Sequence, residues 1–171
     1  VHQKVYLIDD TIINNIYFGS DDGNVYAVDA NGSLLEGYPV SVGSSIVGSV
    51  IFHDITGNGN SNIIFGTNSG EIFAYDADLN LLDHFPVNYQ FPLSSSVQVV
   101  DIDSDGDMEI FAGTSGDLIA VDYKSATNTN FDSWSMFKGD WTRSGYYIAD
   151  DSSTGDCSNP QLGDINCDQI T

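Results

Sequence analysis

Residues 16–40, IYFGSDDGNVYAVDANGSLLEGYPV, recur as residues 63–87, IIFGTNSGEIFAYDADLNLLDHFPV, at an offset of 47 positions with 11 identities in 25. A third copy begins with IFAGTSGDLIAVD at residues 110–122; it keeps this offset as far as Gly113 and then loses one residue. A repeat of this period indicates several copies of one supersecondary unit. The sequence therefore predicts a repeat architecture over most of its length.

Each copy consists of short β-branched and aromatic runs bounded by Gly, Asn, Asp and Ser, a pattern typical of strands joined by tight turns. In the second copy we expect strands at residues 46–54, 62–67, 71–76 and 80–87. Four short antiparallel strands in this length match one blade of a β-propeller. The predicted fold class is all-β: three four-stranded repeats that form part of a propeller, at about residues 1–45, 46–93 and 94–148.

The repeated apolar positions form the predicted core. Small inner positions are Ala27, Ala74 and Ala120, and positions between blades are Phe18, Phe65 and Phe111. An aromatic segment, residues 131–147, is predicted to be a last strand and cap whose core-covering side chains are Trp134, Phe137, Trp141 and Tyr146. Three blades cannot close a ring. We therefore expect further upstream blades, partner chains, or an open arc with exposed edges.

Charge limits the partners. The 171 residues carry 25 acidic and four basic side chains, a formal net charge of −21, which makes phosphate backbones and anionic membranes very poor partners and effectively excludes nucleic acid. No apolar run approaches the roughly 20 residues that span a bilayer. The sequence opens at Val1 directly in a strand-like run, without a leader. We expect it to be part of a longer chain.

The stretch VVDIDSDGDMEIFAG, residues 99–113, places acidic side chains at every second position around Gly106. Oxygen ligands at alternate positions of a loop that turns at glycine are how Ca²⁺ collects six or seven ligands, the seventh position using its backbone carbonyl. No Lys or Arg is expected nearby, so the carboxylates would repel one another without a cation. The predicted Ca²⁺ ligands are Asp101, Asp103, Asp105, Asp107 and Glu109.

Two other stretches are weaker candidates for Ca²⁺. In the second copy, DITGNGNSN keeps the spacing with a single carboxylate; its candidate ligands are Asp54, Thr56, Asn58, Asn60 and Asn62. This loop is either a weaker site, since ligand charge tunes affinity, or a neutral Asn/Gly turn. The corresponding stretch of the first copy, LIDDTIINN, is shorter, lacks the glycine and is predicted to hold no ion.

A polar linker at residues 149–161 leads to the second candidate, in the final segment, residues 162–171. There Asp164, Asn166 and Asp168 occupy alternate positions, but Gln169 stands where glycine is expected and the sequence stops before the twelfth position. This is an incomplete site. Cys157 and Cys167 flank it and would suit one disulfide in an oxidising compartment.

The three units resemble the FG-GAP or VCBS-type repeats of calcium-binding β-propellers, the family that includes the integrin α-subunit propeller. The resemblance covers residues 1 to about 148: Phe18-Gly19 and Phe65-Gly66 stand at the family's Phe-Gly, and the loop from Asp101 to Glu109 matches its calcium motif. The departures are the neutral second loop, the lost first loop and Glu109 where Asp is usual. The final segment resembles the first half of a dockerin or EF-hand-like loop, which in complete form implies attachment to a cohesin-type partner or the cell surface.

This resemblance implies a secreted or cell-surface, non-catalytic module for recognition, adhesion or scaffolding, with a protein or glycan ligand. The only histidines, His2, His53 and His84, fall in no catalytic motif, so no enzyme activity is predicted. Two alternatives stay open: a structural subunit that assembles with copies of itself into an extracellular oligomer or fibre, and an accessory domain of a larger secreted hydrolase.

Overall fold

Turn-forming residues divide the chain into short strands. The computed structural model describes residues 2–8, 11–125 and 134–139, with side chains from residue 15 onward. Within these ranges every regular element is a strand, so the predicted all-β class is confirmed; none of these residues belongs to a helix able to cross a membrane. The strands are β1 (His2–Ile8), β2 (Thr11–Gly19), β3 (Asn24–Val28), β4 (Val40–Ser41), β5 (Ile46–His53), β6 (Asn62–Thr67), β7 (Glu71–Tyr75), β8 (Val87–Asn88), β9 (Gln98–Val100), β10 (Met108–Gly113) and β11 (Leu118–Tyr123).

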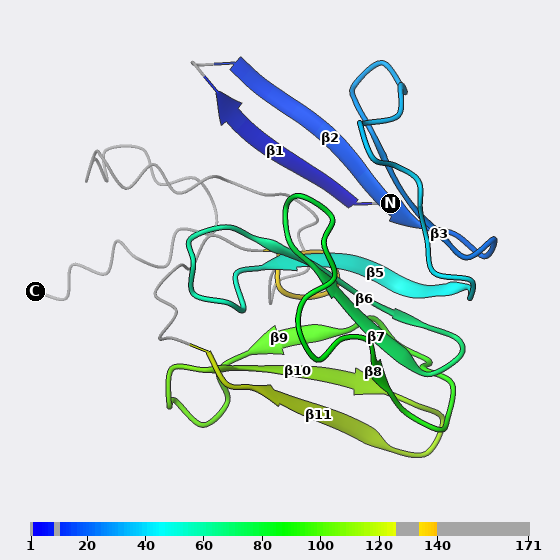
Figure 1. Ribbon diagram of the computed structural model, residues 1–171, viewed down its shortest axis with the longest axis vertical. Helices are drawn as coiled ribbons and strands as arrows, with labels where there is room; N and C mark the ends of the chain where they lie inside the picture. Colours follow the sequence, from blue (N-terminus) through cyan, green and yellow to red (C-terminus); the bar gives the residue numbers. More distant parts are fainter. Residues whose placement is uncertain (1, 9–10, 126–133, 140–171) are drawn as a thin grey trace, which may run out of the picture.

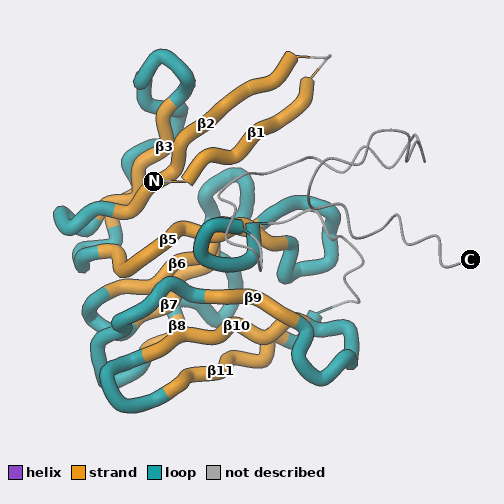
Figure 2. The backbone as a smooth tube through the Cα atoms, turned by 180° about the vertical axis from the view of Figure 1, so that it is seen from behind, coloured by secondary structure: helices purple, strands orange, loops and turns teal. Residues whose placement is uncertain are grey.

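The strands form three antiparallel sheets, each built from consecutive segments of the chain. Their strand orders are β1-β2-β3-β4, β5-β6-β7-β8 and β11-β10-β9. The second sheet lies between the other two, and the view from behind shows the same arrangement (Figures 1 and 2). Each repeat of the sequence therefore forms a sheet of its own.

Strand register reproduces the sequence repeat. Ile16 pairs with Val28 in the first sheet, and Ile63 pairs with Tyr75 in the second, so both partners shift by the same 47 positions. In the third sheet Ile110 pairs with Val121, as the loss of one residue after Gly113 requires. The alignment of the three copies is confirmed as a structural equivalence.

Tight turns at DANG and DADLN follow the third strand of the first two sheets and are held by their first aspartate. In the second sheet, Asp76 Oδ1 accepts hydrogen bonds from the backbone N–H groups of Asp78 at 2.9 Å and Asn80 at 2.8 Å. The fourth strand is shorter than the predicted range 80–87. Only residues 87–88 pair as β8, while Leu81 forms an isolated bridge to Tyr75, because a second turn at residues 83–84 interrupts the run.

The third sheet has three strands within the described residues, and the range 126–133 that precedes Trp134 lies outside them. Trp134 does not extend this sheet as the predicted last strand would. It forms an antiparallel bridge with Phe52 on the edge strand β5, and the adjacent Ser135 O accepts a hydrogen bond from Val99 N on β9 at 2.9 Å. The segment thus links the edges of the second and third sheets.

Of the two predicted cap residues that the structure describes, only one lies in the core. Trp134 is buried in the core, whereas Phe137 is 48% exposed. Trp141 and Tyr146 lie outside the described residues, as do the linker and the final segment. Burial of the indole, together with the backbone hydrogen bonds to Phe52 and Val99, therefore joins this segment to the core.

Burial of the repeated positions depends on whether a sheet has neighbours. Ala27 and Ala74 are fully buried, as predicted, but Ala120 is exposed. Phe111, predicted as the counterpart of Phe65, is only partly buried. It lies opposite Ala120 as Ile64 lies opposite Ala74, so the true counterpart of Phe65 is the buried Ala112. Ala120 is exposed because of its position: no described residue covers the face of the third sheet on which alternate residues of β11 lie.

Neighbouring sheets approach closely at the glycine of the Phe-Gly pairs. A Cβ atom on Gly19 would overlap the side chain of Ile46, the first residue of β5. At the equivalent place one repeat later, a Cβ on Gly66 would lie 2.5 Å from Leu93 Cδ1. Glycine is required here because a neighbouring side chain occupies the space of its missing Cβ.

Substituting Gly19→Ala is therefore expected to destabilise the protein by about 1–3 kcal/mol, since an added methyl group overpacks the junction. Gly116→Ala is the matched control, because a Cβ there meets no atom within 4 Å; its effect should stay within about 0.5 kcal/mol. Urea unfolding measures both. Equal midpoints for the two variants would show that the close approach is not needed.

Candidate metal centre

The acidic loop, residues 101–109, connects β9 to β10 at one end of the third sheet. Its alternating aspartates turn back on the loop's own backbone: Gly106 N donates to Asp101 Oδ2 at 3.2 Å, and Asp107 N donates to Asp105 Oδ1 at 3.0 Å. Gly106 adopts a φ of 94°, which favours glycine. The local sequence thus specifies the sharp turn on which the loop depends.

Glu109, at the start of β10, closes the loop because its side chain binds the loop's backbone. Its Oε2 accepts a hydrogen bond from Ile102 N at 2.8 Å. The residue is 5% exposed, and its other oxygen, Oε1, is buried without a hydrogen-bond partner among the described residues. Asp101 Oδ1 is likewise buried without a hydrogen-bond partner among the described residues. Two buried carboxylate oxygens are therefore left without a donor, which is costly.

Three of the five predicted ligands gather at one point. Carboxylate oxygens of Asp101, Asp103 and Glu109 all lie within 4.8 Å of one another. Asp105 and Asp107 belong to the same loop, but their side chains contact Lys124 instead. The oxygens that converge are those of the first, third and ninth positions, which are hard ligands suited to a hard cation.

Lys124, directly after β11, binds the outer carboxylates. Its Nζ lies 2.7 Å from Asp105 Oδ2, 3.3 Å from Asp107 Oδ2 and 3.0 Å from Asp122 Oδ2. The expectation of no basic side chain near the loop was wrong, because the β10–β11 pairing brings residue 124 back to it. The hydrogen bond from Lys124 lowers the pKa of Asp105, and Asp105 in turn raises the pKa of Lys124.

The loop of the second sheet, residues 54–62, is closed by equivalent hydrogen bonds but carries a single carboxylate. Ile55 N donates to Asn62 Oδ1 at 2.9 Å, as Ile102 N does to Glu109, and Gly59 N donates to Asp54 Oδ2 at 2.6 Å, as Gly106 N does to Asp101. Both loops therefore have one shape. The contacts are equivalent at the first, second, sixth and ninth positions.

The two loops differ in what their first aspartate does. Asp54 Oδ1 accepts hydrogen bonds from Thr56 N and Thr56 Oγ1, both at 3.1 Å, and from Asn58 N at 3.3 Å. Where Glu109 has an unpartnered oxygen, Asn62 has a buried NH₂ group, because its own oxygen is used by Ile55. An NH₂ donor does not bind a cation. Asn62 thus closes the turn without a free oxygen of its own, and the weaker ion site and the neutral Asn/Gly turn both stay predictions.

In the first sheet, Ile8 pairs with Thr11, so only residues 9 and 10 separate β1 from β2. There is no room between these strands for a nine-residue loop like those of the other two sheets. The candidate ligands Asp164, Asn166 and Asp168, together with Cys157 and Cys167, lie outside the described residues.

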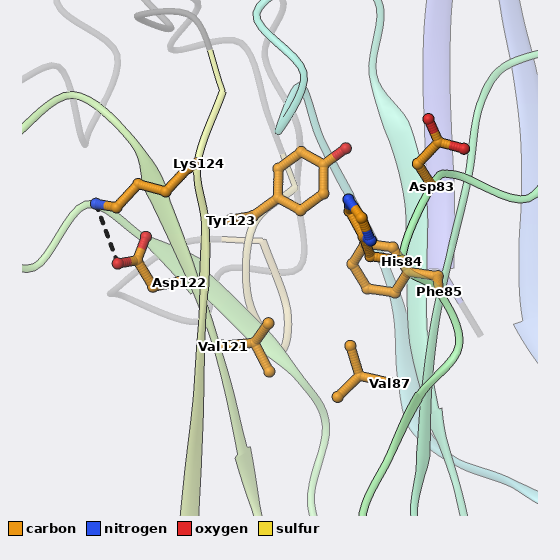
Figure 3. Close-up of a pocket in the computed structure, with 8 residues that line it drawn as sticks. All are labelled: Asp83, His84, Phe85, Val87, Val121, Asp122, Tyr123 and Lys124. Atoms are coloured by element: carbon orange, nitrogen blue, oxygen red, sulfur yellow. Dashed lines mark ion pairs between the residues drawn. The ribbon is translucent and has the colours of Figure 1, made fainter.

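A groove that the sequence did not predict separates the second and third sheets. It has a volume of about 400 Å³ and is lined by residues 83–85 and 87 on one side and 121–124 on the other (Figure 3). At the junction of the first and second sheets, Leu79 packs onto Gly37, where a Cβ would lie 2.6 Å from Leu79 Cδ1. One repeat later the corresponding residues are Ser125 and His84. Ser125 is smaller than Leu79, and the groove lies at this junction.

The histidines do not form a shared site within the described residues. His53 is buried at the end of β5, and burial lowers its pKa against the opposing effect of Asp54. His84 lines the groove beside Phe85, and its backbone has a φ of 70°. His2 lies in β1. A buried neutral imidazole such as that of His53 belongs to the core rather than to a reactive surface.

The sequence matches no family model, and no curated protein matches it significantly.

The hydrogen bonds of Asp54 predict an ion-independent role for the second loop. Asp54→Asn replaces one acceptor oxygen by a donor in a buried site, so we expect a loss of about 1–3 kcal/mol in the free energy of unfolding. The loss should be the same in calcium and in chelator. Asp83→Asn, the same change at an exposed position, is the matched control, and urea unfolding is the measurement. A loss seen only with calcium present would show that Asp54 is an ion ligand.

Proposed function

We propose that this chain is a secreted, calcium-binding module of the β-propeller type that recognises or scaffolds a protein or glycan partner and is not itself a catalyst. The observation that carries the calcium part is Glu109: its carboxylate is 5% exposed, and one oxygen has no hydrogen-bond donor among the described residues. Glu109 contributes a carboxylate oxygen to the cluster formed with Asp101 and Asp103. A cation bound there gives this buried carboxylate a counter-charge.

Charge supports the same assignment. Lys124 contacts Asp105 and Asp107 within the loop, but no described basic side chain contacts Asp101, Asp103 or Glu109. Three carboxylates within 4.8 Å of one another repel strongly when all are ionised. A divalent cation offsets this repulsion directly. The folded protein then gains stability as the calcium concentration rises above Kd.

The ligand chemistry favours Ca²⁺ over other metals. The converging groups are carboxylates, without a thiolate or imidazole among the described members of the cluster, which disfavours Zn²⁺. Alternate oxygens on a flexible loop with a backbone carbonyl at the seventh position match the larger, adaptable coordination shell of Ca²⁺ rather than the strict octahedron of Mg²⁺. The ion's role is structural: it fixes the turn between β9 and β10.

The propeller part of the proposal is supported by three features of the sheets. Each sheet contains one repeat, strand registers are equivalent across the repeats, and successive sheets approach at equivalent glycines. Blades of a propeller are repeated antiparallel sheets of this kind. The secreted location follows from the resemblance and suits calcium modules whose affinities match extracellular Ca²⁺ concentrations.

Self-assembly remains a second candidate because of the third sheet. Leu118 on β11 is 71% exposed and Ala120 beside it is also exposed. An uncovered sheet face at the end of a stack is a surface on which another blade or a second copy can pack. Light scattering on the purified chain separates the two candidates, since the recognition module is expected to be monomeric.

Calcium is expected to raise the melting temperature of the protein, and Asp101→Asn should abolish most of that rise. At a calcium concentration 100 times Kd, the stabilisation amounts to about 2.7 kcal/mol. In chelator the variant should be at least as stable as the wild type, because one of three repelling charges is gone while an acceptor for Gly106 N remains. Thermal unfolding followed by circular dichroism measures both states.

Asp83→Asn again provides the control and should respond to calcium like the wild type. If the melting temperature of the wild type is the same in calcium and in chelator, the acidic loop is not a structural calcium site and the proposal is wrong.

A further inference from the structure

Lys124 occupies a position that the calcium proposal does not explain. Its ammonium group is shared among three carboxylates: Asp105 and Asp107 in the acidic loop, at 2.7 and 3.3 Å, and Asp122 on β11, at 3.0 Å. Figure 3 shows Lys124 extending toward Asp122 and away from the ring of Tyr123. Its side chain is 59% exposed, so it is able to move without disturbing the core.

The lysine accompanies the charged loop and not the neutral one. In the second sheet the residue that corresponds to Lys124 is Asp78, and the residue that corresponds to Asp105 is Asn58. Asn58 Oδ1 accepts a hydrogen bond from Asn60 N at 2.8 Å, as Asp105 Oδ1 does from Asp107 N. The turn itself thus forms without a lysine. The contact with Lys124 instead offsets the additional negative charge of the third loop.

Resting on the proposed function, we propose that Lys124 is a built-in competitor of Ca²⁺ that sets the calcium affinity of the acidic loop. When the loop holds no ion, Lys124 neutralises the fifth-position carboxylate, Asp105. For Asp105 to turn inward to a cation held by Asp101, Asp103 and Glu109, its contact with Lys124 has to break. Lys124 then keeps Asp122 as a partner on the strand.

This competition has two parts that act in the same direction. Breaking the Lys124–Asp105 contact opposes ion binding, and the positive charge left beside the loop repels the entering cation. The calcium-free loop is in turn kept in its folded shape by the lysine. Lys124 therefore lowers the affinity for Ca²⁺ while it protects the empty loop.

The test is calcium titration of the full chain by isothermal calorimetry, comparing wild type with Lys124→Gln. We expect the variant to bind Ca²⁺ about five- to tenfold more tightly at low salt, with a smaller difference at high salt because exposed charges are screened. Lys138→Gln is the matched control: it changes net charge equally, but Lys138 lies over the ring of Phe137 rather than at the loop. It should stay within about twofold of the wild type.

Lys124→Arg keeps the charge and should bind Ca²⁺ like the wild type. A second readout is stability: in chelator Lys124→Gln should melt below Lys138→Gln, and saturating calcium should remove this difference. A purely structural lysine would instead lower stability equally in both conditions.

The outcomes separate the two proposals. If the wild type binds no Ca²⁺, the proposed function itself fails. If the wild type binds Ca²⁺ and Lys124→Gln binds it as weakly as Lys138→Gln, or more weakly than the wild type, the loop is a calcium site but Lys124 does not compete for it.

Discussion

Successive sheets of this molecule pack closely against each other at a glycine in the second strand of a sheet. Ile46 fills the space beside Gly19, and Leu93 fills it beside Gly66. Because these contacts recur at the repeat period, each sheet meets its successor in an equivalent way, and the core runs through all three sheets. The strand registers and the connecting loops are then fixed relative to one another. The acidic loop is placed at the end of the third sheet by this packing.

Loop closure is a second constraint, and it explains why two loops of different charge have one shape. In each, the ninth-position side chain accepts a hydrogen bond from the second-position backbone N–H, and the first aspartate accepts one from the glycine N–H. Neutral Asn62 completes this closure by itself. Glu109 completes it with one oxygen and has a second to spare. The fold requires the turn, and the surplus oxygen is what makes the third loop a candidate for an ion.

The repeat made much of this predictable. An offset of 47 positions in the sequence predicted the strands of the second sheet to within one or two residues for three of its four members, and strand pairing follows the same offset. The fourth strand was predicted too long because a turn at residues 83–84 has no strong glycine or proline signal within it; His84 adopts a positive φ where the first copy has Gly37. Burial of Ala120 was predicted wrongly since a repeat pattern does not reveal which sheet lies at the end of the stack.

The contact between Lys124 and the acidic loop was not predicted, because the two are far apart along the chain. Lys124 lies 19 positions from Asp105 in the sequence, and only the β10–β11 register, with Met108 opposite Tyr123, brings residue 124 to the loop. That register is implied by the second repeat, where Ile63 lies opposite Tyr75. Extending the repeat alignment to pairing, and not only to strand positions, would have identified the contact.

The charge of the whole chain gives this single lysine its weight. With 25 acidic side chains and four basic ones, the field around any carboxylate cluster is already negative and attracts cations. In such a field the carboxylates of an acidic loop without a counter-charge repel one another strongly. Lys124, held between the loop and β11, supplies a positive charge at that point. If the loop binds Ca²⁺ as proposed, its affinity is set by the strand pairing that positions Lys124 as well as by the carboxylates of the loop.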